Sequence, residues 1–274
     1  MSAEPSPQPG RRFAAVLCTA FAAVLVLGWL GPASAGPAGA GAASASPASA
    51  GAGASSVSGS PGAPMLAASA RPVAPAGLPT GVADPPAGTN QLVTVLVSGA
   101  GATSGQLQAW RRSGSGWTSA LGPVRVKVGT AGVGPTHEGL NRTPRGTFTL
   151  PSAFGRQANP GTKMPYRKVT SSDWWVSDPG SPAYNTYRHC APGSCSFNEQ
   201  DGENLGQAGA SYDYAVVIGY NVSPVRAGAG SAFFVHVDAG ARSAGCVETP
   251  RASVIALLRW LDPAQHPRIT IGYS

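Results

Sequence analysis

The stretch FFVHVDAGARSAGCV, from Phe233 to Val247, combines an apolar strand pattern, a glycine turn and two reactive side chains. Its first half is apolar and β-branched, which predicts a buried strand that carries His236. Its second half ends in the turn Ser243-Ala244-Gly245-Cys246, with the cysteine ten positions after the histidine. A thiol nucleophile needs a base to take its proton and N–H groups to stabilise the oxyanion that its attack creates. The stretch offers all three parts and predicts a cysteine-dependent acyl-transfer site.

The cysteine count supports this interpretation, because the chain has four cysteines and only one of them stands outside a targeting or disulfide context. Cys18 lies in an N-terminal apolar run, while Cys190 and Cys195 share a Pro-, Gly- and Ser-rich loop in which a disulfide is expected. Cys246 is left over, and an odd thiol in an exported protein is either reactive or awaits a partner. A zinc site is the alternative, but the Cys spacing fits zinc patterns poorly. We expect no metal and no cofactor.

Residues 1–35 have the order of a secretory signal. A polar segment that ends in Arg11-Arg12 precedes the apolar run 13–30, and Ala33-Ser34-Ala35 offers a cleavage site. An uncleaved membrane anchor through residues 13–30 is the alternative. Residues 36–89 are rich in Ala, Gly, Ser and Pro and predict a disordered linker. These features predict a protein that acts outside the cytoplasm, either secreted or associated with the wall or membrane.

The net charge of the chain is +7, and its basic residues are scattered rather than clustered. Nucleic acid is therefore not an expected partner. A mild positive surplus suits polyanionic surroundings such as a cell wall or phospholipid head groups. We expect a monomer.

Residues 91–274 are long enough for one domain with a core, and strand patterns dominate them. One helix is expected from Pro250 to Leu261, capped by Thr249 and stopped by Pro263. Its N-terminus would favour a thiolate at Cys246. The fold class predicted is mainly β, a sandwich or open curved barrel with one C-terminal helix beside the cysteine. The expected strands are Gln91–Ser98, Gln106–Arg111, Val124–Val128, Thr147–Leu150, Asp173–Val176, Tyr214–Tyr220, Phe233–Val237 and Arg268–Gly272.

Three segments in a fixed order carry a family resemblance. Residues 141–148, NRTPRGTF, contain a Thr-Pro-x-Gly-x-Phe pattern, and residues 212–221, YDYAVVIGYN, form an apolar strand after them. Last comes His236 with the Ser-x-Gly-Cys-apolar motif of Ser243–Val247. In these segments the chain resembles the L,D-transpeptidases, whose YkuD-type catalytic domain cross-links bacterial peptidoglycan. The resemblance covers roughly residues 91–274, the expected catalytic domain.

The resemblance implies that Cys246 attacks a diamino acid carbonyl in a peptidoglycan stem peptide and releases D-Ala. An amine of a second stem would then take the acyl group, giving a 3→3 cross-link. His236 would act as the base, and the N–H groups of Gly245 and Cys246 would form the oxyanion hole. Ser243 would orient the turn or bond the substrate. Asp238 shares a strand face with His236, and would orient the imidazole or, like Ala244, contact the substrate.

The chain also departs from the family's common pattern. Ala244 stands where a second histidine is common, and Glu248 stands where Arg or Asn is common. The gap between His236 and Cys246 is short. Two alternatives therefore stay open: a carboxypeptidase that uses water as the acceptor, and a non-catalytic wall-binding protein of the same fold.

Three further features carry no role that the sequence assigns. His137-Glu138 is expected in a solvated loop, and Glu203 in a loop that could flank the cleft. Trp174-Trp175 is expected to place one ring in the core and the other toward a groove.

Overall fold

A computed structural model describes residues 77–274 of the chain. The expected export signal, the alternative anchor at residues 13–30 and most of the expected linker lie outside the described residues. Within residues 77–274, no helix is long and apolar enough to cross a membrane. Leu78 and Val82, which belong to the expected linker, pack against a small cluster of Leu92, Trp110 and Trp117.

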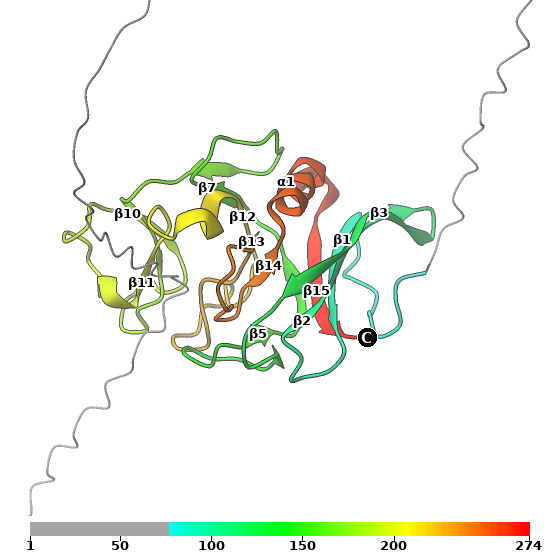
Figure 1. Ribbon diagram of the computed structural model, residues 1–274, viewed down its shortest axis with the longest axis horizontal. Helices are drawn as coiled ribbons and strands as arrows, with labels where there is room; N and C mark the ends of the chain where they lie inside the picture. The colour runs from blue at the N-terminus through cyan, green and yellow to red at the C-terminus, as the bar shows by residue number, and fades with distance from the viewer. Residues whose placement is uncertain (1–76) are drawn as a thin grey trace, which may run out of the picture. The chain divides into compact units, whose positions relative to one another are not determined.

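One curled sheet of ten strands forms most of the described part (Figure 1). This confirms the mainly β fold in its open, barrel-like form. In sheet order the strands are β6 (Gly146–Thr149), β15 (Arg268–Tyr273), β1 (Gln91–Val97), β2 (Ser104–Ser113), β3 (Gly116–Lys127), β14 (Val247–Thr249), β13 (Phe234–Val237), β12 (Ala215–Val217), β7 (Ala153–Gly155) and β8 (Tyr166–Lys168).

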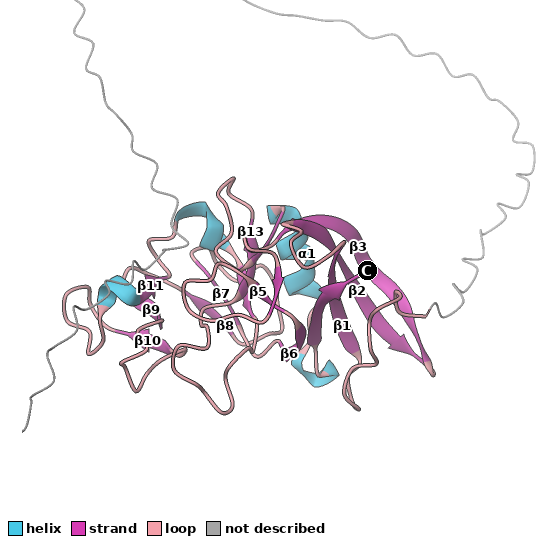
Figure 2. Cartoon of the chain, turned by 90° about the horizontal axis from the view of Figure 1, so that it is seen from below, coloured by secondary structure: helices cyan, strands magenta, loops and turns pink. Residues whose placement is uncertain are grey.

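Two smaller sheets accompany it. One has the order β10 (Tyr187–His189), β9 (Asp173–Val176) and β11 (Gly202–Asn204), and the other pairs β4 (Val133–Gly134) with β5 (Thr143–Pro144). The three-stranded sheet lies at one end of the described part, with β1, β2 and β3 at the other (Figure 2). Three short 3₁₀ helices complete the fold: η1 (Glu199–Asp201), η2 (Gly209–Asp213) and η3 (Pro263–Gln265).

Strand β13 separates two apolar clusters because its side chains alternate between the faces of the sheet. Val235 and Val237 belong to the larger cluster, which also contains the buried side of helix α1 (Arg251–Trp260). Phe234 belongs to a second cluster with Phe154, Tyr212 and Cys246. Cys246 thus lies on the face of β13 opposite α1.

Helix α1 is the only α-helix of the described residues, as expected, and its apolar stripe is buried at Val254, Leu257 and Leu258. Its cap differs from the expectation. Pro250 occupies the N-cap position and no side chain caps the helix. Thr249 is the last residue of β14, where its carbonyl accepts a hydrogen bond from the Asp238 N–H at 2.9 Å. The ladder with β13 holds Thr249 in the strand, so it cannot act as the cap.

Candidate active site

The turn that carries Cys246 is fastened by its own serine. The Ser243 hydroxyl donates to the Cys246 carbonyl at 2.7 Å and accepts the Gly245 N–H at 3.1 Å. Of the two roles expected for Ser243, the structure has it holding the turn. The Gly245 N–H is therefore already engaged, contrary to the expectation that it stands ready for an oxyanion. Gly245 has φ +143°, and a Cβ there would lie 2.7 Å from the Phe233 ring, so only glycine fits.

A further hydrogen bond to the turn comes from a segment about a hundred residues earlier in the chain. Thr143, in the Thr-Pro pattern, donates its hydroxyl proton to the Gly245 carbonyl at 2.7 Å. The same hydroxyl accepts the Gly129 N–H at 2.8 Å, and the Thr130 N–H donates to the Ser243 carbonyl at 3.0 Å. Because Thr143 is fully buried, these bonds compete little with water. The Thr-Pro segment therefore positions the cysteine turn.

His236 lies in the middle of β13 and is buried. Its Nδ1 is 2.9 Å from the Val237 carbonyl oxygen, and its ring packs edge-on against Tyr212 at 5.2 Å between centroids. Burial lowers the pKa of His236 to about 4, although the Val237 carbonyl and the Asp238 charge partly oppose it. A neutral imidazole that donates Nδ1–H to Val237 keeps an Nε2 lone pair, and Nε2 has no hydrogen-bond partner among the described residues. This is the form that a general base requires.

The strand register places Cys246 and His236 on one face. Val235 pairs with Val247 and His236 with Glu248 in the parallel ladder, so Cys246 is nearly level with Phe234 and diagonal to His236. The Cys246 Sγ lies 3.3 Å from the Ala232 carbonyl, to which the thiol donates. The thiol thus donates to Ala232, while the His236 ring packs against Tyr212, a member of the same apolar cluster as Cys246.

Asp238 does not contact the imidazole through a hydrogen bond. Its carboxylate is 2.7 Å from the Lys127 ammonium and accepts the Gly240 N–H at 2.8 Å. Partial burial alone would raise the pKa of Asp238, but the hydrogen bonds from Lys127 and Gly240 hold it below its usual value. Orientation of His236, expected from Asp238, comes instead from the Val237 backbone carbonyl.

A cavity of about 620 Å³ opens beside the cysteine. Ala244, Gly245 and Cys246 form part of its wall, whereas Ser243, His236 and Asp238 do not line it. Its charged side chains are Glu138, Asp201 and Glu203, with His137 beside them and no lysine or arginine in this part of the wall. The described wall of the cavity is therefore rich in acidic side chains and includes Cys246.

Glu138 was expected in a solvated loop, and that expectation is wrong. Its carboxylate accepts hydrogen bonds from the Tyr184 hydroxyl and, at 2.5 Å, from the Ser231 hydroxyl. Burial, followed by the Glu138 bond and charge, raises the pKa of Tyr184 above its ordinary value. Tyr184 also accepts the Gly230 N–H at 3.0 Å. Glu138 is half-buried rather than solvated, and its carboxylate links its own loop to Tyr184 and to Ser231.

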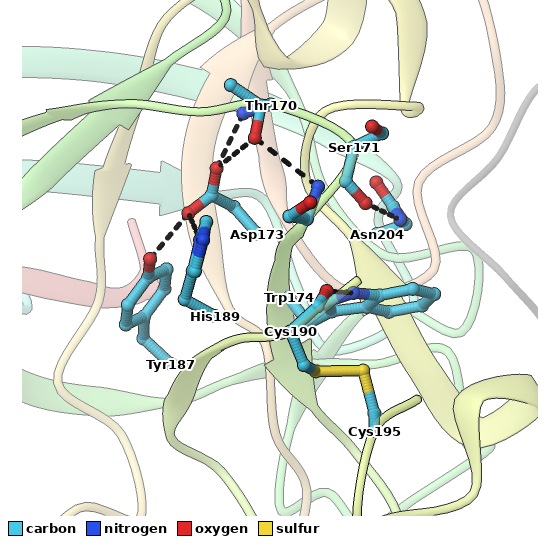
Figure 3. Close-up of polar contacts among 10 residues, drawn as sticks. Thr170, Ser171, Asp173, Trp174, Tyr187, His189, Cys190, Cys195 and Asn204 are labelled. Atoms are coloured by element: carbon cyan, nitrogen blue, oxygen red, sulfur yellow. Dashed lines mark hydrogen bonds and ion pairs between the residues drawn. A yellow bond between two sulfur atoms is a disulfide. The ribbon is translucent and has the colours of Figure 1, made fainter. Parts of the chain in front are cut away.

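The far wall of the cavity comes from the small sheet and the segments next to it, including Glu203 on β11. Asp173 on β9 anchors this sheet (Figure 3), where it accepts hydrogen bonds from Tyr187, Thr170 and His189. Burial would raise the pKa of Asp173, but the bonds from Tyr187 and Thr170 outweigh it and hold the pKa at about 2.

The predicted disulfide between Cys190 and Cys195 is confirmed next to this network, and the Trp174 indole N–H donates to the Cys190 carbonyl (Figure 3). Trp174 is buried, while Trp175 is only half-buried and lines a second cavity. Among the described residues, no group of three or more His, Cys, Asp or Glu side chains is placed to hold a metal ion.

The family model of the L,D-transpeptidase catalytic domain, YkuD, matches residues 102–271. This match spans more than half of the chain, including the Thr143 segment, His236 and Cys246. The chain belongs to the L,D-transpeptidase (YkuD) family. No curated protein and no solved structure matches it.

Membership of the L,D-transpeptidase family agrees with the resemblance predicted from the sequence motifs. The structure places Ser243 and Gly245 in the turn of Cys246, His236 on the neighbouring strand of the ladder, and Ala244 in the cavity wall. One relation differs from expectation: strand β14 separates Cys246 from the first turn of α1. A helix dipole acts within about one turn of the helix end, and three strand residues span about 10 Å. The helix therefore contributes little to the thiolate.

Sequence reasoning missed two residues at this L,D-transpeptidase site. Thr143 was noticed only as part of a motif, and Glu248 only as a departure from one. Glu248 is buried on β14 directly opposite His236 in the ladder. A carboxyl side chain two positions after the cysteine was the available signal, because alternation puts both on one strand face.

Proposed function

We propose that this protein is an exported cysteine acyltransferase that acts on peptidoglycan stem peptides and transfers the acyl group to an amine. The observation that carries the proposal is the position of Cys246, in the wall of a cavity with acidic side chains and on one strand face with a neutral buried histidine. Membership of the L,D-transpeptidase family supports the substrate class.

In the first half-reaction, the Cys246 thiol gives up its hydrogen bond to the Ala232 carbonyl, and His236 Nε2 takes its proton. The thiolate attacks the donor carbonyl carbon, and the developing oxyanion is stabilised by the Cys246 N–H. The C–N bond then breaks, and His236 returns the proton to the departing amine of D-Ala. The product is a thioester on Cys246.

In the second half-reaction, the side-chain amine of another stem attacks the thioester carbonyl and gives its proton to His236. The C–S bond breaks, and the Cys246 thiolate recovers that proton. One amide has replaced another, so no oxidant, reductant or external energy source is needed. With water as the attacking group, the same steps would give a carboxylic acid.

The charge of the cavity favours an amine acceptor over a carboxypeptidase reaction. Glu138 and Asp201 line the cavity that Cys246 also lines, and the described wall contains no lysine or arginine. An ammonium group that approaches the site gains favourable Coulomb energy in such a cavity, while water gains none.

The test is intact mass spectrometry after incubation with a carbapenem, a β-lactam that acylates nucleophilic residues. We expect one covalent adduct on the wild-type protein and none on Cys246→Ala. A second reaction, with a stem tetrapeptide as donor and a second stem peptide whose diamino acid side chain is the acceptor, should release D-Ala and form the cross-linked dimer. Release of D-Ala without a dimer would assign the carboxypeptidase reaction. No adduct, no D-Ala and equal peptidoglycan binding by both proteins would overturn the proposal in favour of wall binding.

A further inference from the structure

The buried carboxyl of Glu248 has no role in the steps above, yet it lies within the same site. Glu248 is 4% exposed and sits at the centre of β14. It pairs with His236 across the parallel ladder and with Lys127 of β3 on its other side. Paired residues of neighbouring strands lie about 5 Å apart and direct their side chains to the same face. Glu248 is therefore the direct cross-strand neighbour of the base.

Two buried polar atoms of this row of side chains lack a hydrogen-bond partner. His236 Nε2 and Glu248 Oε2 are both without a hydrogen-bond partner in the described part of the chain. Buried polar atoms in native proteins are nearly always bonded, and an unpaired one costs about 1–3 kcal/mol. Two such atoms on adjacent residues indicate a site arranged for proton transfer rather than for stability alone.

The surroundings of Glu248 keep both of its protonation states accessible near neutral pH. Burial raises the pKa of Glu248 to about 7, and the Asp238 charge adds to this. Lys127 and the Ser243 hydroxyl oppose the rise. The charged and titratable groups that face it are thus Lys127 on β3, with His236 and Asp238 on and just after β13.

We propose that Glu248 is a positioning residue that supplies the counter-charge for the imidazolium of His236. When His236 takes the thiol proton, a positive charge appears on a buried ring whose one hydrogen-bond partner among the described residues is the Val237 carbonyl. An unpaired buried charge is costly, and a carboxylate directly across the ladder offsets that cost. Glu248 lies directly across the ladder from His236, whereas Cys246 is two residues before it along the chain. The charge of Glu248 therefore stabilises the imidazolium more than it opposes the thiolate.

This inference rests on the proposed function, since it assigns His236 as the base, but its test does not require a stem peptide. The test is the pH dependence of Cys246 alkylation by iodoacetamide, followed by intact mass, in the purified protein. In Glu248→Gln we expect the midpoint of alkylation to move up by about one pH unit, with about tenfold slower alkylation at pH 7. Glu248→Asp should recover part of the loss.

The control is Asp262→Asn, which removes a carboxylate paired with Lys163 next to η3 while Asn keeps the cap to the Ala264 N–H. Its alkylation profile should match the wild type. A Glu248→Gln profile that superimposes on the wild type would overturn the inference. With a stem-peptide donor, Glu248→Gln should lower kcat about tenfold with little change in KM, because Glu248 does not line the cavity.

A measurement on the wild-type protein covers the case in which Glu248→Gln does not fold. The ring resonances of His236 should show an inflection near pH 7 that reports the titration of Glu248, besides the acidic one of the ring itself. Absence of that inflection would refute the coupling. If Cys246 is acylated normally while neither the His236 resonances nor the alkylation profiles depend on Glu248, this inference fails and the proposed function stands. If no donor acylates the wild-type protein, the proposed function fails.

Discussion

Strand β13 presents Val235 and Val237 to one side of the sheet, and Phe234 and His236 to the other. The first side is closed by α1, where Val235 and Val237 belong to the larger apolar cluster. The second side holds Cys246 and His236, together with Glu248 from the neighbouring strand. Four consecutive residues thus contribute alternately to a stable core and to a reactive site. Stability and reactivity in this fold can therefore be changed separately, by choosing the face.

The largest effects are expected from the reactive face. Cys246→Ala should abolish acylation by a stem-peptide donor, and His236→Ala should lower it by about 10²–10⁴, because it removes proton transfer. Both variants should unfold at nearly the wild-type temperature. Asp238→Asn is the matched control, and it should lose less than about tenfold, since Val237 and not Asp238 holds the imidazole. Equal losses in Asp238→Asn and His236→Ala would show that the three residues act as a triad.

The α1 face should respond in stability rather than in chemistry. Leu257→Ala should lower the free energy of unfolding by about 3 kcal/mol, because it leaves a cavity in the larger cluster. The rate of acylation by the folded fraction should stay near wild type. Phe234→Leu on the opposite face should instead change both, since its ring packs against Phe154, Trp175 and Tyr212 next to Cys246. Urea unfolding and single-turnover acylation measure the two quantities. A large rate loss in Leu257→Ala would break the separation.

The hydrogen bonds of the Thr143 hydroxyl should affect both stability and the rate of acylation. Thr143→Val keeps the shape but removes the bonds to the Gly245 carbonyl and from the Gly129 N–H, so we expect about 2 kcal/mol of destabilisation. Acylation should also slow, because the turn loses its fixed position. Thr143→Ser retains the hydroxyl and should restore most of both. If Thr143→Val were as stable and active as Thr143→Ser, the hydrogen bonds of Thr143 would not be needed to position the turn.

The smallest expected effect is on the pH dependence of stability, to which His236 and Glu248 contribute with opposite signs. Burial lowers the pKa of His236 from 6.5 to about 4, so the unfolded chain binds more protons in that range and stability rises with pH. Burial raises the pKa of Glu248 from 4.5 to about 7, so the folded chain binds more protons and stability falls with pH. Each contribution should amount to about 1–3 kcal/mol over its pH range, because one pKa unit corresponds to about 1.4 kcal/mol.

Urea unfolding between pH 4 and pH 7 separates these contributions. Relative to wild type, His236→Asn should lose the rising slope and Glu248→Gln the falling one. The two variants should therefore diverge as pH increases. Parallel curves would mean that the two side chains do not titrate in the folded protein as their burial requires.

Some of this protein was determined by its sequence alone. Period-two apolar patterns predicted the central strands, and Asp173–Val176 agrees residue for residue with β9. The stripe of Val254, Leu257 and Leu258 predicted α1, and the loop context of Cys190 and Cys195 predicted their disulfide. The His236 and Cys246 motifs indicated the family that the comparison with known domains shows. All of these signals are local, because periodicity, turn chemistry and motif spacing need no distant partner.

Tertiary structure decided the rest. Except for β12, which lies within an expected strand, the two- and three-residue strands were not expected, because they are too short to have a period and are held by their neighbours: β4, β5, β7, β8, β10, β11 and β14. The hold of Thr143 on Gly245 joins residues that are 102 positions apart. Glu138 was expected in solvent, but Tyr184 and Ser231 enclose it. The pKa of Glu248 is set by burial between β3 and β13. Local sequence records neither long-range contacts nor desolvation, and these make an ordinary glutamate part of the site.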